Sequence, residues 1–337
     1  MAVTTIPPLN LPVSTLMSTM TSLIGDVRFL ETLAPSDLVN ELVNSARIGN
    51  VDFGKGIIYT FKTDLQPVKT LTEQSSAFTI TKPNVAQEVI AIDNYKFIPI
   101  STSSVLTRDA FLNGYAMDEF FAFVMSTLND TETFFMYDVV NNLIQSWQPV
   151  QATQTITVNQ INTTTLTGNA LNEALKWNSN EVAKSMRKVV NNMKIKNKGY
   201  TDVSQYLGHD GQQHDVISAL RGDEIKVTFN DKYLTNIMAD SLATLYHESI
   251  VGDMIPGDNY IVLPTSAMTR DNENTIAWVG HKNKFAFADF YRVTNSIVDP
   301  STLYENTFMH FAYGAGVFKY APCVKFVANY VEPGAVA

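Results

Sequence analysis

The chain has 337 residues, of which 45% are apolar and 17% are charged, and its formal net charge is −9. This length allows one large domain or two ordinary ones, with enough apolar residues to fill a core. The negative charge argues against a protein that tracks nucleic-acid phosphates, because such binding needs Lys and Arg to displace counterions. The charged fraction is lower than usual, which indicates that much of the surface is covered by something other than water.

Cys323 is the only cysteine, which excludes an internal disulfide framework and a cysteine-based zinc site. Its apolar neighbours predict a small buried side chain rather than a nucleophile. Residues 1–25 contain no Lys or Arg and lack the continuous apolar core of a signal peptide. No apolar run approaches the roughly 18 residues that span a bilayer. We therefore expect a soluble protein with no membrane association.

Residues 1–33 mix Thr, Ser and Pro with scattered Leu, Met and Ile. Such a segment cannot form its own core, yet it has more hydrophobic residues than a free tail. An arm that lies on a neighbouring subunit and a poorly ordered terminus are both consistent with this pattern. The sequence at 34–37 then indicates a helix start, and Leu38, Leu42 and Ala46 predict a short amphipathic helix after it.

Residues 54–84, GKGIIYTFKTDLQPVKTLTEQSSAFTITKPN, begin as a strand and return as a second strand at 77–81. Some dozen mostly polar residues separate the two, without the Asn-Gly or Asp-Gly pair that a tight hairpin prefers. This stretch, which we call the tongue, therefore predicts a long two-stranded projection. The alternating residues 85–106 predict further strand.

Residues 115–148 contain neither Gly nor Pro, and their apolar residues recur at helical spacing. A single helix over 117–147 would be about 46 Å long. Its charged residues are all acidic. A break near 129–131, where a second helix could be capped, is the main alternative.

A linker or small edge hairpin is expected at 151–167, followed by a second long helix from Asn169 to about Lys196. This second helix is strongly basic. It could pair with the acidic helix, within the fold or across subunits, or its basic face could simply be solvated. Further elements are strands at 223–230, 259–264 and 309–331, and a helix at 232–246.

The sequence contains no pattern that indicates catalysis. His209 and His214 are five residues apart, which is not the helical spacing of a zinc motif, so a loop metal site or ordinary polar loop residues are the two interpretations. Arg221-Gly222-Asp223 is expected to be a turn without a binding role. We find no nucleophile elbow and no phosphate-binding loop, and therefore expect no enzyme activity and no cofactor.

The order of these parts resembles the major capsid proteins of tailed bacteriophages, which have the Hong-Kong-97-type fold. The stretch DNYKFIPISTSSVLTRDAF at 93–111 is similar to the strand that leads into the family's long spine helix. The resemblance implies an α+β fold with an N-terminal arm, an extended loop, a peripheral domain and an axial domain. The implied ranges are arm 1–33, peripheral domain 34–53 and 85–164 with spine helix 117–147, extended loop 54–84, axial domain 165–300, and C-terminal strands 301–337 that return to the peripheral domain.

The resemblance also implies what the chain does. It would assemble with many copies of itself, as pentamers and hexamers, into an icosahedral or prolate shell around double-stranded DNA that it does not read by sequence. Scaffolding, portal and decoration proteins are further partners of such shells, and the expected location is the virion after assembly in the host cytoplasm. Within the extended loop, Lys62, Asp64, Lys69 and Glu73 would contact another subunit.

Two alternative functions remain open at this point. One is the shell protein of an encapsulin-type compartment, which would share the fold. The other is a soluble hydrolase whose Cys–His or metal site is assembled by the fold near His209, His214 or Cys323.

Overall fold

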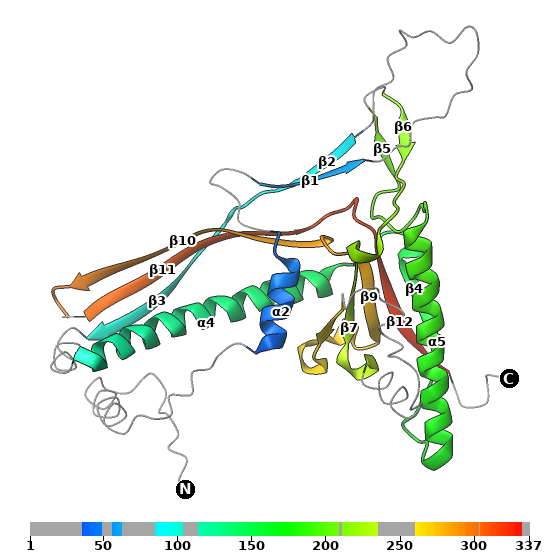
Figure 1. The fold of residues 1–337 in the computed structure, drawn as a ribbon, viewed down its shortest axis with the longest axis horizontal. Helices are drawn as coiled ribbons and strands as arrows, with labels where there is room; N and C mark the ends of the chain where they lie inside the picture. The colour runs from blue at the N-terminus through cyan, green and yellow to red at the C-terminus, as the bar shows by residue number, and fades with distance from the viewer. Residues whose placement is uncertain are drawn as a thin grey trace.

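The computed structural model describes residues 36–48, 56–62, 85–103, 114–208, 211–234, 260–302 and 304–331. These residues form a long limb and a broader end, joined near the middle of the chain's long axis (Figure 1). Two sheets, one in each part, and two long helices account for most of the described structure. None of the described helices is long and apolar enough to span a membrane.

Helix α4, Gly114–Ser146, runs without interruption for 33 residues, or about 50 Å. The predicted long helix is therefore confirmed, and the alternative of a break near 129–131 is wrong. The hydroxyls of Thr131 and Thr133 donate to the carbonyl oxygens of Thr127 and Asn129, four residues earlier in the same helix. Side chains that bond back to the preceding turn in this way do not cap a new helix.

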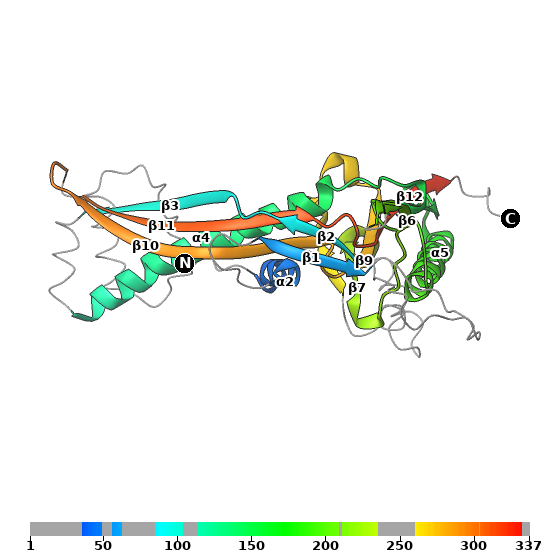
Figure 2. The same cartoon turned by 90° about the horizontal axis from the view of Figure 1, so that it is seen from above.

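The limb is built from α4 and a three-stranded antiparallel sheet that runs along it (Figures 1 and 2). The strands, in the order β10-β11-β3, are β10 (Phe285–Asp299), β11 (Tyr304–Val317) and β3 (Asn94–Ser103). On the face toward α4, Ile98, Ile100 and Met309 pack against Val124 and Leu128 of the helix. This contact explains why α4 can be so long, since its apolar stripe is covered along much of its length.

The broader end contains a five-stranded sheet in the order β4-β12-β9-β7-β8. Its strands are β4 (Thr155–Ile161), β12 (Cys323–Val331), β9 (Thr275–His281), β7 (Ile225–Asn230) and β8 (Tyr260–Leu263). The pairs β4–β12 and β7–β8 are parallel, and the two inner pairs are antiparallel. The expected linker or hairpin at 151–167 is thus a single edge strand, and the C-terminal stretch supplies strands to both sheets.

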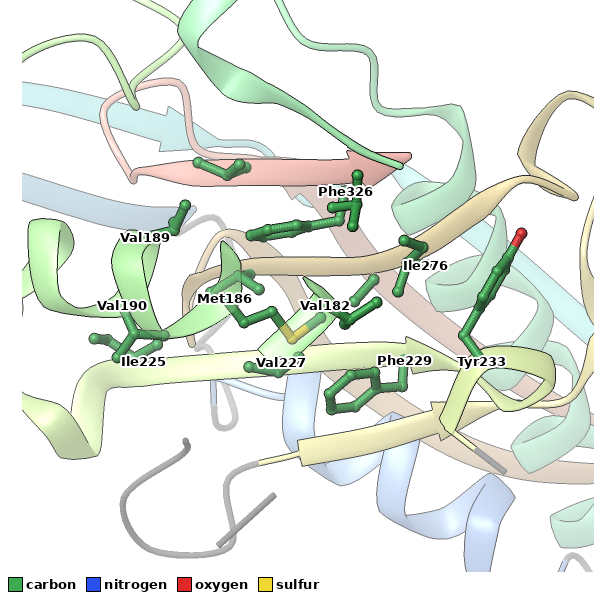
Figure 3. Close-up of a cluster of buried hydrophobic side chains, with 14 of the residues drawn as sticks. Val182, Met186, Val189, Val190, Ile225, Val227, Phe229, Tyr233, Ile276 and Phe326 are labelled. Atoms are coloured by element: carbon green, nitrogen blue, oxygen red, sulfur yellow. The ribbon is translucent and has the colours of Figure 1, made fainter. Parts of the chain in front are cut away.

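Helix α5, Gly168–Lys194, covers one face of this sheet and confirms the second predicted long helix. Figure 3 shows its buried side chains, among them Val182 and Met186, between Val227 and Phe229 of β7 and Phe326 of β12. The opposite face packs against the C-terminal half of α4 and against α2, Asp37–Ala46. The sheet is therefore the middle layer of three, with α4 and α5 on opposite sides.

The remaining elements are short. They are β1 (Ile57–Lys62), β2 (Val85–Ile90), β5 (Gln205–Leu207) and β6 (Gln213–Asp215), with 3-10 turns η1 (Ala152–Gln154), η2 (Gly222–Glu224), η3 (Thr265–Ala267) and η4 (Arg270–Asn272). Residues 231–234 are helical, as predicted for 232–246, and the rest of that helix lies outside the described residues.

A buried lysine joins the limb to the broader end. Lys284, with 1% of its side chain exposed, lies in the turn between β9 and β10. Its Nζ is 2.9 Å from Oδ2 of Asp202 and donates to the carbonyl oxygens of Phe318 and Ala321, each at 2.9 Å. The ammonium also lies 5.3 Å from the ring centroid of Trp147, just after α4. All three of its donors have an acceptor, which is the condition for burying an ammonium group.

The carboxylate of Asp202 extends this contact to further segments. Its Oδ2 accepts from Nε1 of Trp147 at 3.2 Å, and its Oδ1 accepts from Nε2 of Gln154 at 2.8 Å. Burial lowers the pKa of Lys284, while nearby negative charge, including that of Asp202, opposes this shift. Four segments that are distant in sequence thus meet at one ion pair.

We expect Lys284→Met to destabilise the protein by about 3–5 kcal/mol, because it leaves the carboxylate of Asp202 buried without its cation. The matched control is Lys282→Met, two residues earlier, where the lysine is exposed and the loss should be within about 0.5 kcal/mol. Urea unfolding of both variants measures the difference. Equal unfolding midpoints for the two variants would show that the buried pair does not stabilise the fold.

Candidate inter-subunit surfaces

The strands on either side of the predicted tongue pair with each other. β1 and β2 form an antiparallel ribbon in which Ile57 lies opposite Ile90 and Lys62 lies opposite Val85. The first predicted strand is therefore confirmed, and its partner is β2. The second predicted strand, 77–81, lies outside the described residues.

The inner face of the ribbon is attached to the body of the molecule. Ile57 is buried, and the ring of Tyr59 stacks on Phe318 with centroids 4.7 Å apart. Glu88 accepts a hydrogen bond from the backbone N–H of Tyr320 at 3.3 Å. Burial, with the charges of Glu224 and Glu88, raises the pKa of Tyr59 to about 12, so its ring stays uncharged in this contact.

Glycines in β11 let the chain after the ribbon approach closely. A Cβ at Gly314 would lie 2.9 Å from the carbonyl oxygen of Ala91, and one at Gly316 would lie 2.8 Å from the side chain of Ile90. The YGAG stretch therefore serves close backbone packing and not phosphate binding.

The outer face of the ribbon is apolar and exposed. Ile58 and Val89 lie opposite each other on this face, with 61% and 62% of their surface exposed, and Val85 is 48% exposed. Thr60 and Gln87 lie on the same face next to this pair, and the register places Lys62 opposite Val85 on it. A cross-strand pair of β-branched residues is a usual element of a packed surface, yet here it faces away from the body.

A second exposed apolar surface covers the limb. We call it the open sheet face. It is the side of the three-stranded sheet that points away from α4, and it extends from Tyr291 to the far end of the limb. The register places the following residues on it: Tyr95, Phe97 and Pro99 of β3, Phe308 and His310 of β11, and Tyr291, Val293 and Ile297 of β10. Tyr95 is 64% exposed, Phe97 57% and Ile297 63%. Ser101, Asn295 and Asn306 lie on the same face toward its far end. An exposed group of apolar side chains of this kind usually marks a contact with another molecule.

The open sheet face is also nearly free of charge. Asp299, at the far end of β10, is the one Asp, Glu, Lys or Arg that the register of the described strands places on it. Phe97 instead contacts the rings of Phe308 and His310, with centroids 6.0 and 5.9 Å apart. Sequence reasoning missed this surface, because both alternating phases of 94–103 are partly apolar and alternation alone does not say which one is buried.

The four predicted loop residues are not brought together by the described structure. Lys62 is the last residue of β1, and nothing further is described of its side chain. Asp64, Lys69 and Glu73 lie outside the described residues. Their contact with another subunit stays a prediction.

Residues considered for chemistry have other surroundings. Cys323 is buried as expected, and burial raises the pKa of its thiol to about 12, so it is not a poised nucleophile. His209 lies outside the described residues, while His214 lies on β6 with its ring centroid 5.6 Å from that of Tyr206. No group of three or more His, Cys, Asp or Glu residues in the described ranges could hold a metal ion.

The tripeptide at 221–223 forms part of a 3-10 turn. The backbone N–H of Arg221 donates to Oε2 of Glu224 at 2.9 Å, which ties the turn to the start of β7. This is the local role expected for it from the sequence.

Comparison of the fold with solved structures finds similar chains in structures of phage capsids and phage heads. The chain is similar to one in the capsid of Staphylococcus phage Andhra, with a TM-score of 0.62, 9% identity, and 90% of this chain and 87% of that chain covered. A chain in the structure of the head fibre and inner core protein of bacteriophage P68 gives a TM-score of 0.60 at 10% identity, covering 90% and 87%. A chain in the capsid of cyanophage P-SCSP1u gives a TM-score of 0.56 at 10% identity, with 91% of this chain and 92% of that chain covered. The predicted Hong-Kong-97-like α+β fold is therefore confirmed.

Sequence comparison points to the same class of protein. No curated protein sequence matches the chain. The family model of Phi29-like phage major capsid proteins matches residues 35–327, which is most of the chain. The encapsulin-type and hydrolase alternatives receive no support from these matches. The chain therefore belongs to the Phi29-like family of phage major capsid proteins, structural components of the virion shell.

Proposed function

We propose that this capsid protein holds its shell together mainly through the tongue, residues 54–84, which lies on a neighbouring copy of the chain. The observation that carries this proposal is the ribbon at the tongue's root, whose inner face is anchored by Tyr59 while its outer face exposes Ile58 and Val89. An anchored root sets the direction of the projection. The exposed outer pair then has no partner among the described residues of its own subunit.

The open sheet face of the neighbour is the surface we propose for this contact. Both surfaces are made of strands, and both expose apolar side chains with almost no charge among their described residues. Burying them against each other would remove large side chains such as Tyr95 and Phe97 from water, at about 25 cal/mol for each Å² of apolar surface. Lys62, Asp64, Lys69 and Glu73 would then lie at or beyond this contact.

We further propose that the limb is the peripheral domain and the broader end is the axial domain. This division modifies the ranges expected from the sequence. β10, within the expected axial range 165–300, pairs with β11 of the limb, and β12, within the expected returning strands 301–337, pairs with β4 and β9 of the broader end. Strand pairing is a firmer guide to domain membership than position in the sequence.

The proposed assembly consists of pentamers and hexamers of this chain around double-stranded DNA. The net charge of −9 supports a container that does not hold the genome through many phosphate contacts. Scaffolding, portal and decoration proteins are proposed as further partners, with assembly in the host cytoplasm. The proposed role is purely structural, without catalysis.

Deleting residues 64–76 should leave the subunit folded but unable to form stable shells, because the tip of the tongue would no longer reach the neighbour. Electron microscopy and light scattering of the purified protein measure assembly, and circular dichroism checks the fold. A matched control replaces the same 13 residues with a flexible Gly-Ser segment of equal length, which keeps the reach but removes the contacts. Normal shells from the deletion variant would refute the tongue assignment.

Placing a charge on the open sheet face should also impair assembly. Phe97→Glu would bury a carboxylate in the proposed contact, and we expect the concentration needed for assembly to rise at least about tenfold. Val150→Glu is the control, because Val150 is 68% exposed but lies in the loop after α4. If both variants assemble like the unmodified chain, the open sheet face is not the contact surface.

A further inference from the structure

A small cavity lies under the C-terminal end of α2, on the side of the five-stranded sheet that packs against α4. It is lined by Ser45 and Ala46 of α2, by Ile144 of α4, and by residues of β7, β9 and the turn between β9 and β10. It leaves about 20 Å³ of room for the centre of a water-sized atom. This is enough for one water molecule or one monatomic ion, and too little for a larger group such as phosphate.

The pairing of β7 with β9 sets the chemistry of one wall of this cavity. Thr228 of β7 lies directly opposite Trp278 of β9, and Lys226, two residues before Thr228, lies opposite Gly280. Opposite residues of an antiparallel pair point to the same face of the sheet, and so do residues two apart in one strand. The ammonium, the hydroxyl and the indole N–H of this wall therefore belong to one face, and all three side chains line the cavity.

The indole of Trp278 has an unused donor at this wall. The side chain is 1% exposed, and no hydrogen-bond partner of its Nε1 is present among the described residues. An indole N–H can only donate, so the partner that it lacks must be an acceptor. Because a buried donor without an acceptor is costly, an acceptor bound in the cavity would stabilise the fold.

The lining also has positive charge without a matching negative charge. Lys226, Lys282 and Lys284 line the cavity, whereas no Asp or Glu of the described chain does. The ammonium of Lys284 is already balanced by Asp202. The half-buried Lys226 forms no ion pair with a described residue, and the acidic group that acts on it is the exposed Glu41 of α2. The missing acceptor and the unbalanced charge therefore meet in the same place.

The one histidine of the lining does not change this balance. The Nδ1 atom of His281 accepts from the backbone N–H of Asn283 at 3.0 Å, so its proton is on the other ring nitrogen. Burial is the main cause that lowers the pKa of His281, although Glu224 opposes this shift. The ring is thus neutral at neutral pH and adds neither a charge nor a counter-ion for Lys226.

We propose that this cavity binds one monatomic anion, chloride, between Lys226, Thr228 and Trp278. The ammonium supplies the opposite charge, and the hydroxyl and the indole N–H supply neutral donors. A water molecule could accept from the same donors, but it would leave the charge of Lys226 uncompensated. Since α2 covers the cavity, the bound ion would fasten this helix, which precedes the tongue in the chain, to the middle layer of the fold.

Thermal unfolding in two salts tests the site. We expect sodium chloride in place of sodium gluconate, at equal concentration and pH 6, to raise the unfolding midpoint by about 2 °C, since a ligand that binds only the folded state stabilises it. The rise should saturate as chloride replaces gluconate at constant total salt. Burial lowers the pKa of Lys226 to about 7, so its ammonium is charged at pH 6.

Lys226→Met should remove the rise caused by chloride while the protein still folds, because methionine occupies similar space without a charge. Thr228→Val keeps the lysine, removes one donor and should reduce the rise. The matched control is Lys319→Met, which removes an exposed lysine outside the cavity and should keep the full rise. Circular dichroism confirms that each variant folds.

Three results would overturn the inference. Equal responses of Lys226→Met and Lys319→Met to chloride would show a general salt effect. Equal midpoints of the unmodified chain in the two salts would show that the cavity holds water only. If Lys226→Met does not fold, a full rise in Thr228→Val would refute the site, and a reduced rise would support it. The measurement concerns the folded subunit, so its outcome is separate from that of the assembly experiments.

Discussion

The buried ion pair of Lys284 and Asp202 is the contact on which the arrangement of the two sheets depends. An ammonium group that is 99% inaccessible must have all of its donors satisfied, and here the acceptors come from the loop after α5 and from the turn between β11 and β12. Trp147 fixes the end of α4 to the same point. A relative shift of the limb and the broader end would therefore separate two buried charges. A subunit that must present surfaces to several neighbours at once needs this rigidity.

The two sheets differ in how far their faces are covered within the subunit. One face of the five-stranded sheet packs on α5 and the other on α4 and α2, so this sheet is complete within the subunit. The three-stranded sheet is covered by α4 on one face only, and its open face exposes Tyr95, Phe97 and Ile297. The low charged fraction of the sequence has its structural counterpart here. The residues that would otherwise be charged on a solvated sheet are aromatic or β-branched.

The sequence predicted the elements better than it predicted their partners. α4 and α5 followed from apolar spacing over long stretches without Gly or Pro, which is the strongest local signal a sequence contains. The burial of Lys284, in the turn HKNK, has no local signal in the sequence, because burial of a charge depends on partners that are distant in sequence. The stretch 309–331 alternates throughout, yet it divides between two sheets at Pro322, a separation that periodicity does not reveal. For the candidate surfaces, the sequence predicted the tongue, of which only residues 56–62 are described, and it did not indicate the open sheet face.

The proposed contacts between copies would be individually weak, and their number would account for a stable shell. A surface ion pair or a partly buried strand face contributes little by itself, and a single such interface would dissociate readily. In a closed shell each subunit is held by several contacts at once, so the loss of one is reversed before the others open. That gain requires the contacts to keep a fixed geometry relative to one another. The ribbon rooted by Tyr59 and the sheet backed by α4 are both tied to the same rigid body, and Lys284 closes the junction between its two parts.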